Sequence, residues 1–178
     1  MQNDLKALWR LVAPPARPVA GNRSWDWLFA ELGTALPADY VALMKVYGGG
    51  TFGRGLFLWT PLDERGLPLL APEAIEDARS ISDEQPLPMW PEPGGFLPFG
   101  ENIEGDKFGW LTSGDPDSWP LIFLERHGDP DEQEPPLPLS LAALIVEWLS
   151  GRSVQTINLP VFGPEDNLRD RTLFEPLT

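Results

Sequence analysis

The stretch "VYGGGTFGRG", residues 46–55, decides how the surrounding chain folds. Gly48, Gly50 and Gly53 follow the pattern G-x-G-x-x-G, which is the spacing of loops that bind phosphate groups. Upstream of the glycines, apolar residues recur at helical spacing after Pro37, a residue favoured in the first turn of a helix. These apolar positions are Tyr40, Leu43, Met44 and Tyr47. Downstream, "GLFLWT" at 55–60 is short, apolar and aromatic, which predicts a strand.

The order helix, glycines, strand argues against a nucleotide site. A dinucleotide-binding loop joins a strand to the N-terminus of a helix, where free N–H groups and the helix dipole hold the phosphates. Here a phosphate would meet a helix C-terminus, which is partly negative. No Lys-Ser or Lys-Thr pair follows the glycines either, so a P-loop is excluded. We therefore interpret Gly48, Gly49 and Gly50 as a structural turn, with a positive φ at Gly48 or Gly49 just past the helix end.

The rest of the chain alternates helix and strand signals. Further helices are predicted over 5–12, 24–33, 71–81 and 140–151, with Ser24 and Ser140 as N-caps and Gly33 and Gly151 as stops. Strands are predicted at 107–112 and 119–125, and "FLPFG" at 96–100 is read as a short strand or an extended approach to one. "VQTINLPVF" at 154–162 is strand-like. Because "WPLIFLE" at 119–125 is almost continuously apolar, we expect a central strand that is buried on both faces.

Tryptophan is abundant, and its positions separate core from candidate interface. Trp9, Trp25 and Trp148 lie on the apolar faces of predicted helices, which favours the core. Trp27, Trp59 and Trp90 are less easily placed, and an exposed Trp among them would indicate an interface, where this residue is enriched.

The composition narrows the classes of protein. The 178 residues suggest one domain, and 42% of them are hydrophobic, which is enough for a sizeable core. There is no cysteine, which excludes disulfides and zinc-thiolate sites. The N-terminal "MQNDLKALWRLV" is a poor signal peptide, and no apolar run approaches the ~18 residues of a membrane span. We expect a cytoplasmic protein.

The charge is strongly negative and uneven. Against 13 Lys and Arg stand 27 Asp and Glu, a net charge of −14, so nucleic acid and anionic membranes are not expected as partners. A basic protein is electrostatically plausible as a partner. Only Lys107 and Arg126 oppose the ten acids between residues 101 and 134. The simpler alternative is that these acids belong to solvated loops that keep the protein soluble.

No catalytic or metal-binding pattern stands out. His127 is the only histidine, lies in a Gly/Pro/acid loop and has no G-x-S-x-G motif beside it, so we interpret it as a surface residue. Some pair of carboxylates among 27 acids will always have a suitable spacing for glycosidase chemistry, so such pairs indicate little. The segments "ENIEGD" at 101–106 and "GDPDEQE" at 128–134 do not follow the calcium-loop pattern. We expect no catalytic residues, no metal and no cofactor.

Four segments in order carry a family resemblance. "LPADYVALMKVYGGG" at 36–50 resembles the entry motif of the SUKH superfamily, the family of the yeast Smi/Knr-type cell-wall regulators. "FLPFGENIEGDKFGWLT" at 96–112, "WPLIFLERHGD" at 119–129 and "SLAALIVEWLSG" at 140–151 are similar to its later blocks. The resemblance covers about 24–151. It implies an α+β fold with a twisted, mainly antiparallel sheet wrapped by helices, which agrees with the elements predicted above. We expect one domain over 1–152 and a C-terminal extension over 153–178.

The resemblance also implies a function. Bacterial proteins that resemble this chain are mostly immunity proteins, which bind and neutralise toxin domains, commonly nucleases, without catalysis. The expected partner is a basic toxin domain; the alternatives are a scaffold or regulatory protein and a hydrolase with an unrecognised carboxylate pair. The acids that we expect to contact the partner are Glu101, Glu104, Asp106, Asp129, Asp131, Glu132 and Glu134.

Overall fold

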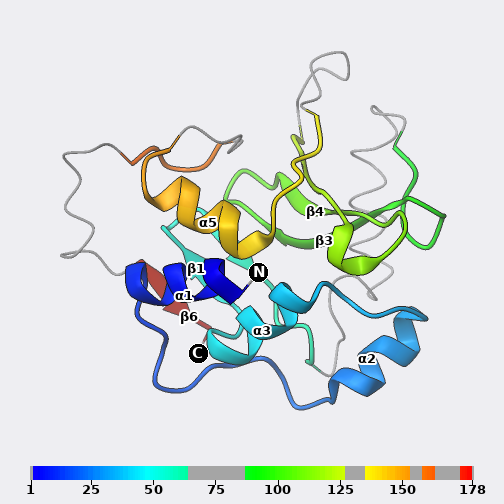
Figure 1. Ribbon diagram of the computed structural model, residues 1–178, viewed down its shortest axis with the longest axis horizontal. Coiled ribbons are helices and arrows are strands. Elements are labelled where there is room, and N and C mark those ends of the chain that lie inside the picture. The colour runs from blue at the N-terminus through cyan, green and yellow to red at the C-terminus, as the bar shows by residue number, and fades with distance from the viewer. Residues whose placement is uncertain (1, 64–86, 127–134, 153–157, 163–172, 178) are drawn as a thin grey trace.

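The fold is α+β, as predicted. The computed structural model describes residues 2–63, 87–126, 135–152, 158–162 and 173–177 (Figure 1). Within these residues, the helices are α1 (Gln2–Leu11), α2 (Trp25–Leu32), α3 (Ala38–Val46), α5 (Leu141–Leu149) and the short 3-10 helix η1 (Pro116–Ser118). The strands are β1 (Gly50–Phe52), β2 (Leu56–Leu58), β3 (Phe96–Glu101), β4 (Lys107–Leu111), β5 (Leu121–Leu124) and β6 (Phe174–Pro176). The helix predicted over 71–81 lies outside the described residues.

Helices α2, α3 and α5 begin directly after the predicted residues Ser24, Pro37 and Ser140. Helix α1 begins at Gln2, before the predicted start at Leu5. The Ser24 hydroxyl accepts a hydrogen bond from the Trp27 N–H at 3.1 Å, and the Ser140 hydroxyl accepts one from the Ala143 N–H at 3.2 Å. Each bond satisfies an N–H group that has no partner within its helix. Gly33 ends α2 with a φ of 67°, a left-handed conformation that glycine adopts without steric cost.

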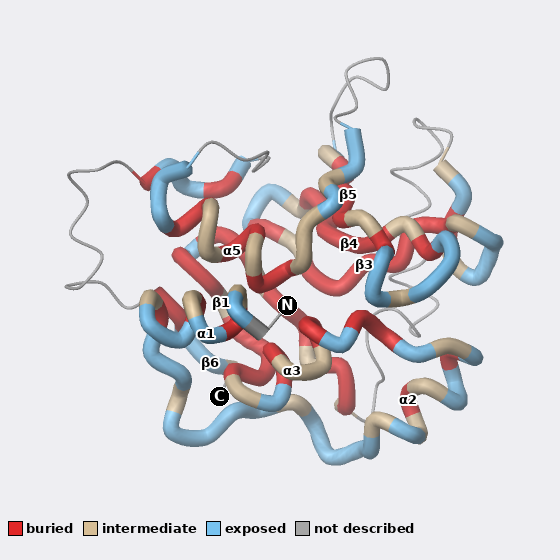
Figure 2. Tube along the Cα trace, viewed as in Figure 1, coloured by how far each residue is buried: buried red, intermediate tan, exposed pale blue. Residues whose placement is uncertain are grey.

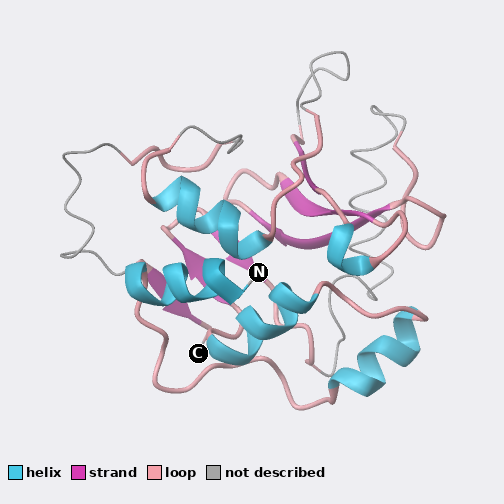
Figure 3. Cartoon of the chain, viewed as in Figure 1, coloured by secondary structure: helices cyan, strands magenta, loops and turns pink. Residues whose placement is uncertain are grey.

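All six strands form one antiparallel sheet in the order β5-β4-β3-β2-β1-β6 (Figure 3). Our placement of residues 119–125 at the centre of the sheet was wrong, because β5 is an edge strand. All four residues of β5 are nevertheless buried. Beyond the edge, Leu121 and Leu137 exchange two backbone hydrogen bonds of 2.9 and 2.7 Å, which cover part of the strand.

The two faces of the sheet are both covered near β5. Since side chains alternate along a strand, Leu121 and Phe123 join the main core, whereas Ile122 and Leu124 form a smaller cluster with Met89 and others on the opposite face. A continuous apolar run therefore indicates burial on both faces, and it does not indicate a central position in the sheet.

The residues after 152 contribute to the sheet and the core. The strand-like signal at 154–162 was misleading for its described part, because residues 158–162 form no strand. Instead β6, which we did not predict, pairs with β1. The residues of this region that are buried in the main core are Leu159, Phe162, Leu173 and Phe174. The region that we expected to be an extension thus supplies an edge strand and core side chains.

The main core lies between the sheet and helices α1, α3 and α5, as the burial colouring in Figure 2 shows. The predicted face of α3 is fully buried. Trp148 and Trp59 are buried, and Trp25, Trp27 and Trp90 are partly buried against the core. Our assignment of Trp9 to the core was wrong, since 44% of this residue is exposed. None of the helices in the described ranges is long and apolar enough to span a membrane.

Candidate functional site

The glycine run connects α3 to β1. Gly48 follows the helix with a φ of 73°, and its N–H donates to the Met44 carbonyl at 3.0 Å. A Cβ atom at Gly48 would overlap the backbone of Val19, so the chain packs tightly against this helix end. We expected the first strand at 55–60, but β1 already begins at Gly50, and β2 occupies only Leu56–Leu58. The space beside Gly48, where a ligand would have to lie, is thus occupied by the protein's own backbone.

The turn between β1 and β2 has an unusual conformation. Its two central residues, Gly53 and Arg54, have φ values of 53° and 59°, and the Gly55 N–H donates to the Phe52 carbonyl at 3.0 Å. Positive φ at both positions is typical of type I′ hairpin turns, which favour Asn and Gly. An arginine with this backbone costs about 1–2 kcal/mol.

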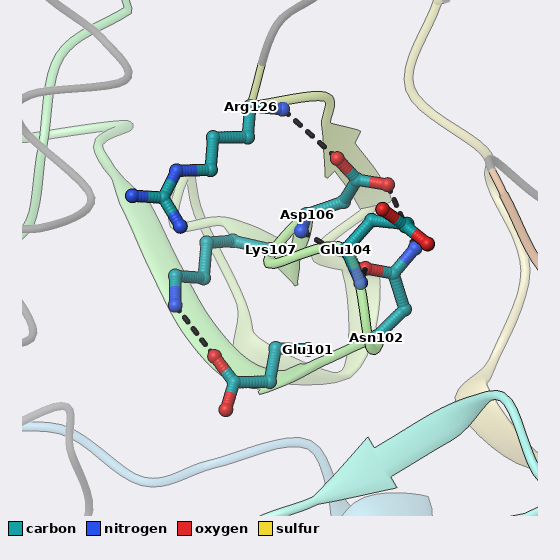
Figure 4. Close-up of polar contacts among 6 residues, drawn as sticks. All are labelled: Glu101, Asn102, Glu104, Asp106, Lys107 and Arg126. Atoms are coloured by element: carbon teal, nitrogen blue, oxygen red, sulfur yellow. Dashed lines mark hydrogen bonds and ion pairs between the residues drawn. The ribbon is translucent and has the colours of Figure 1, made fainter.

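The turn between β3 and β4 is built around a buried carboxylate, Asp106, of which 2% is exposed. One carboxylate oxygen accepts the backbone N–H of Arg126 at 2.9 Å (Figure 4). The other accepts the side-chain amides of Asn102 at 2.7 Å and Asn158 at 2.8 Å. Asp106 therefore ties the β3–β4 turn to the end of β5 and to the segment 158–162.

Asn102 completes the same turn. Its side-chain oxygen accepts the backbone N–H groups of Glu104 and Asp106, both at 3.0 Å. Beside the turn, the ammonium group of Lys107 lies 2.6 Å from a carboxylate oxygen of Glu101 (Figure 4). The same ammonium group lies 5.7 Å from the ring centroid of Trp59. Lys107 is itself buried, so the ion pair and the aromatic ring compensate for its lost hydration.

The structure separates the acids that the sequence analysis grouped as partner contacts. Asp106 is enclosed and its carboxylate is occupied by three internal donors. Glu101 is partly exposed and paired with Lys107, and Glu104 is exposed. The other four predicted acids, and His127, lie outside the described residues; they are Asp129, Asp131, Glu132 and Glu134.

A hollow of about 540 Å³ opens beside this turn. Four segments line it. The β1–β2 turn contributes Arg54, the β3–β4 turn contributes Ile103 and Glu104, the end of β5 contributes Glu125, and the segment 158–162 contributes Pro160. We call this the hairpin hollow. It brings together segments that are about 100 residues apart in the sequence.

One highly exposed apolar side chain lines the hairpin hollow, and a second lies next to a lining residue in the chain. Ile103, which lines it, is 90% exposed, and so is Val161, which follows the lining residue Pro160 in the chain. Sequence reasoning missed both. Ile103 carried a signal, because it is a single large apolar residue within the polar turn "ENIEGD".

A second hollow of about 550 Å³ lies next to η1 and the start of α5. Two of its carboxylates accept hydrogen bonds from backbone N–H groups. Asp117 accepts the Ala38 N–H at 2.7 Å, and buried Asp39 accepts the Ala142 N–H at 3.4 Å. Burial raises the pKa of Asp39, an effect that backbone hydrogen bonds oppose and nearby Asp117 reinforces. Within the described ranges, no group of three or more His, Cys, Asp or Glu residues could hold a metal ion.

Comparison with known proteins identifies the family. Residues 30–143 match the SUKH_6 family model, described as SMI1-KNR4 cell-wall. The chain belongs to this SUKH family. The match includes the β1–β2 hairpin and the β3–β4 turn, so both elements lie within the region that defines the family. No curated protein and no solved structure matches the chain.

Proposed function

We propose that this SUKH protein is an immunity protein, which binds a toxin domain and neutralises it without catalysis. The observation that carries the proposal is the family membership of residues 30–143, because SUKH proteins are typically immunity proteins of polymorphic toxin systems. The hairpin hollow supports a binding role, since the almost fully exposed Ile103 lines it on a hydrogen-bonded support, and the equally exposed Val161 follows its lining residue Pro160.

The charge supports a basic toxin domain, and a nuclease in particular. A nuclease that binds a phosphate backbone needs a positive surface. A chain of net charge −14 attracts such a surface over several ångströms and accelerates encounter. The acids at 129–134 remain a prediction as partner contacts, whereas Asp106 is better explained as a structural residue.

Two alternative functions do not involve a toxin: the protein acts as a scaffold, or it acts as a hydrolase. A scaffold would bind its partner without changing the viability of a host that carries a toxin. A hydrolase would act on many substrate molecules per protein molecule. These differences allow a single experimental system to separate the three functions.

The test is co-expression with the toxin domain that we expect a gene next to this one to encode. We expect the wild-type chain to restore growth of cells that express the toxin, and the purified proteins to co-elute as a complex. Growth arrest that is unchanged by the chain, together with no complex between the purified proteins, would contradict the immunity function.

A further inference from the structure

We propose that the hairpin hollow is the surface that docks the partner, and that it takes a single lysine or arginine flanked by an apolar side chain of a protein. This inference rests on the proposed function and deepens it. It assigns the contact to the β1–β2 turn, the β3–β4 turn and the segment 158–162, whereas the sequence pointed to acids alone.

The apolar part of the inference comes from Ile103 and Val161. Each side chain is 90% exposed, while the other two large exposed apolar residues in the described ranges, Trp9 and Val19, are 44% and 41% exposed. Ile103 lines the hollow, and Val161 follows the lining residue Pro160 in the chain. Highly exposed apolar side chains in and next to a hollow are typical of interaction sites. A partner that covers them recovers the hydrophobic free energy of both side chains.

The charged part comes from the two carboxylates of the hollow, Glu104 and Glu125. They favour a cation, and the aliphatic stem of a lysine or arginine packs well on residues such as Ile103 and Pro160. Arg54 lines the same hollow and carries the opposite charge. A densely basic surface would place a second cation near Arg54, so the hollow favours one cation beside an apolar neighbour.

The support of the hollow is rigid, which lowers the entropy lost on binding. Asp106 joins three of the four lining segments through its hydrogen bonds. The indole N–H of Trp148 donates to the Pro160 carbonyl at 2.8 Å and also fixes the segment 158–162 to α5. The fourth segment, the β1–β2 turn, packs directly against Pro160. Gly55 lies so close to Pro160 that a Cβ atom would overlap its ring.

The backbone of the hollow provides an independent indication. In the described part of the chain, the only non-glycine residues with positive φ are Arg54 and Asn158, and both line this hollow. Asn tolerates that conformation, but arginine does not favour it. Such strain persists where a side chain is needed, and it clusters at binding sites. We infer that the Arg54 side chain contacts the partner.

The test measures affinity for the same toxin domain, by calorimetry or biolayer interferometry. Three variants change exposed side chains of the hollow: Ile103→Ser, Val161→Ser and Glu104→Gln. We expect Kd to rise at least tenfold for each apolar variant. For Glu104→Gln, we expect a several-fold slower association and a weaker salt dependence, since exposed charges act mainly on the association rate.

Matched controls lie away from the hollow. Val19→Ser removes an exposed apolar side chain, and Glu92→Gln neutralises an exposed acid before the start of β3, whereas the hollow lies at the other end of that strand. Both controls should bind as the wild type does. Melting temperatures of Ile103→Ser, Val161→Ser, Glu104→Gln and Glu92→Gln should stay within a few degrees of the wild-type value, because these side chains are exposed. The melting temperature of Val19→Ser is measured as well, since Val19 is 41% exposed.

Arg54→Gly separates binding from stability. Glycine relieves the backbone strain, so the melting temperature should rise, while the loss of the guanidinium should raise Kd about tenfold. Arg54→Lys keeps the charge and the strain, and it should bind more tightly than Arg54→Gly. A structural role for Arg54 would instead give a glycine variant that binds normally.

The outcomes distinguish the two proposals. If the wild-type chain neither binds nor neutralises the toxin domain, the immunity function fails. If Ile103→Ser, Val161→Ser, Glu104→Gln and Arg54→Gly all bind as tightly as the wild type, the immunity function stands and the docking surface is overturned. A loss of affinity in the controls equal to that in the hollow variants would also overturn it.

Discussion

Tyr40 in α3 and Tyr47 directly after it are both buried, but they differ in the hydrogen bonding of their hydroxyl groups. The Tyr47 hydroxyl donates to the Val12 carbonyl at 2.7 Å, whereas the Tyr40 hydroxyl has no hydrogen-bond partner among the described residues. Both side chains are fully buried. A buried hydroxyl without a partner destabilises the fold, because its hydration is lost and nothing replaces it.

The pair therefore gives a matched prediction. Tyr40→Phe should leave the free energy of unfolding unchanged or raise it by up to ~1 kcal/mol, whereas Tyr47→Phe should lower it by about 1 kcal/mol. Denaturant unfolding of both variants measures the two values. A Tyr40→Phe variant that loses as much stability as Tyr47→Phe would show that the Tyr40 hydroxyl is bonded.

Asp39 gives a prediction about pH. Burial raises its pKa above the ordinary value of 3.8, so the folded protein keeps this proton at pH values where the unfolded chain has lost it. Stability from this group is therefore fully present below pH 3.8 and is lost as the pH rises through the folded pKa.

The comparison with Asp39→Asn isolates this group, because asparagine keeps an oxygen that can accept from Ala142. The stability of the wild type relative to the variant should fall as the pH rises from 3.5 to 6.5. Urea unfolding of both proteins over this range measures the difference. A difference that stays constant or increases with pH would contradict the raised pKa.

At the scale of elements, the end of α3 is fixed by Gly48. Its positive φ and the close Val19 backbone both exclude a side chain. Gly33, at the end of α2, has a similar φ of 67° but open space around it. Gly33→Ala should cost about 1 kcal/mol from backbone strain alone, and Gly48→Ala should cost more, about 2–4 kcal/mol.

Thermal and denaturant unfolding measure both glycine variants. Equal losses would mean that Val19 moves away easily. ATP or NAD should not change the melting temperature of the wild type, because the glycines contact the protein's own backbone. Saturable stabilisation by either nucleotide would contradict the structural role of the turn.

Asp106 joins elements that are far apart in the sequence. Replacement by asparagine sets an amide against N–H donors from Arg126, Asn102 and Asn158, so at least one donor loses its acceptor. We expect Asp106→Asn to lower the free energy of unfolding by about 1–3 kcal/mol. A neutral Glu104→Gln variant serves as the control. If Asp106→Asn were as stable as that control, the hydrogen bonds of Asp106 would contribute nothing to the stability of the fold.

The elements also show how far sequence reasoning reaches. The helices could be predicted from the helical spacing of apolar residues and from capping residues such as Ser24 and Ser140, because both signals are local in the sequence. The edge position of β5 and the pairing of β6 depend on distant partners. β6 is three residues long, and only its first residue is buried, so it has no alternating pattern to detect.

The candidate site was predictable only in part. Acidity between 101 and 134 was visible as a count of charges, but the count could not separate enclosed Asp106 from exposed Glu104. Arg54 and Pro160 meet in one hollow only because the sheet brings their segments together. The φ of Arg54 and the exposure of Ile103 are three-dimensional properties, and the sequence contained no more than an isolated isoleucine and an arginine between two glycines.

At the scale of the whole molecule, we propose that this acidic SUKH protein acts by covering a surface of its partner. In this proposal, the charge of −14 accelerates encounter with a basic partner, and the hairpin hollow provides the close contact. Because both contributions act by binding, the amount of toxin that is inhibited should be proportional to the amount of this protein that is added. A catalyst would instead act at trace amounts.

The most direct measurement is the residual activity of the purified toxin domain as the wild-type chain is added. We predict that toxin activity decreases linearly and reaches zero where the complex is saturated, and that the Ile103→Ser variant requires higher concentrations. Full inactivation by a trace of the chain, or undiminished toxin activity at a large excess, would contradict this prediction.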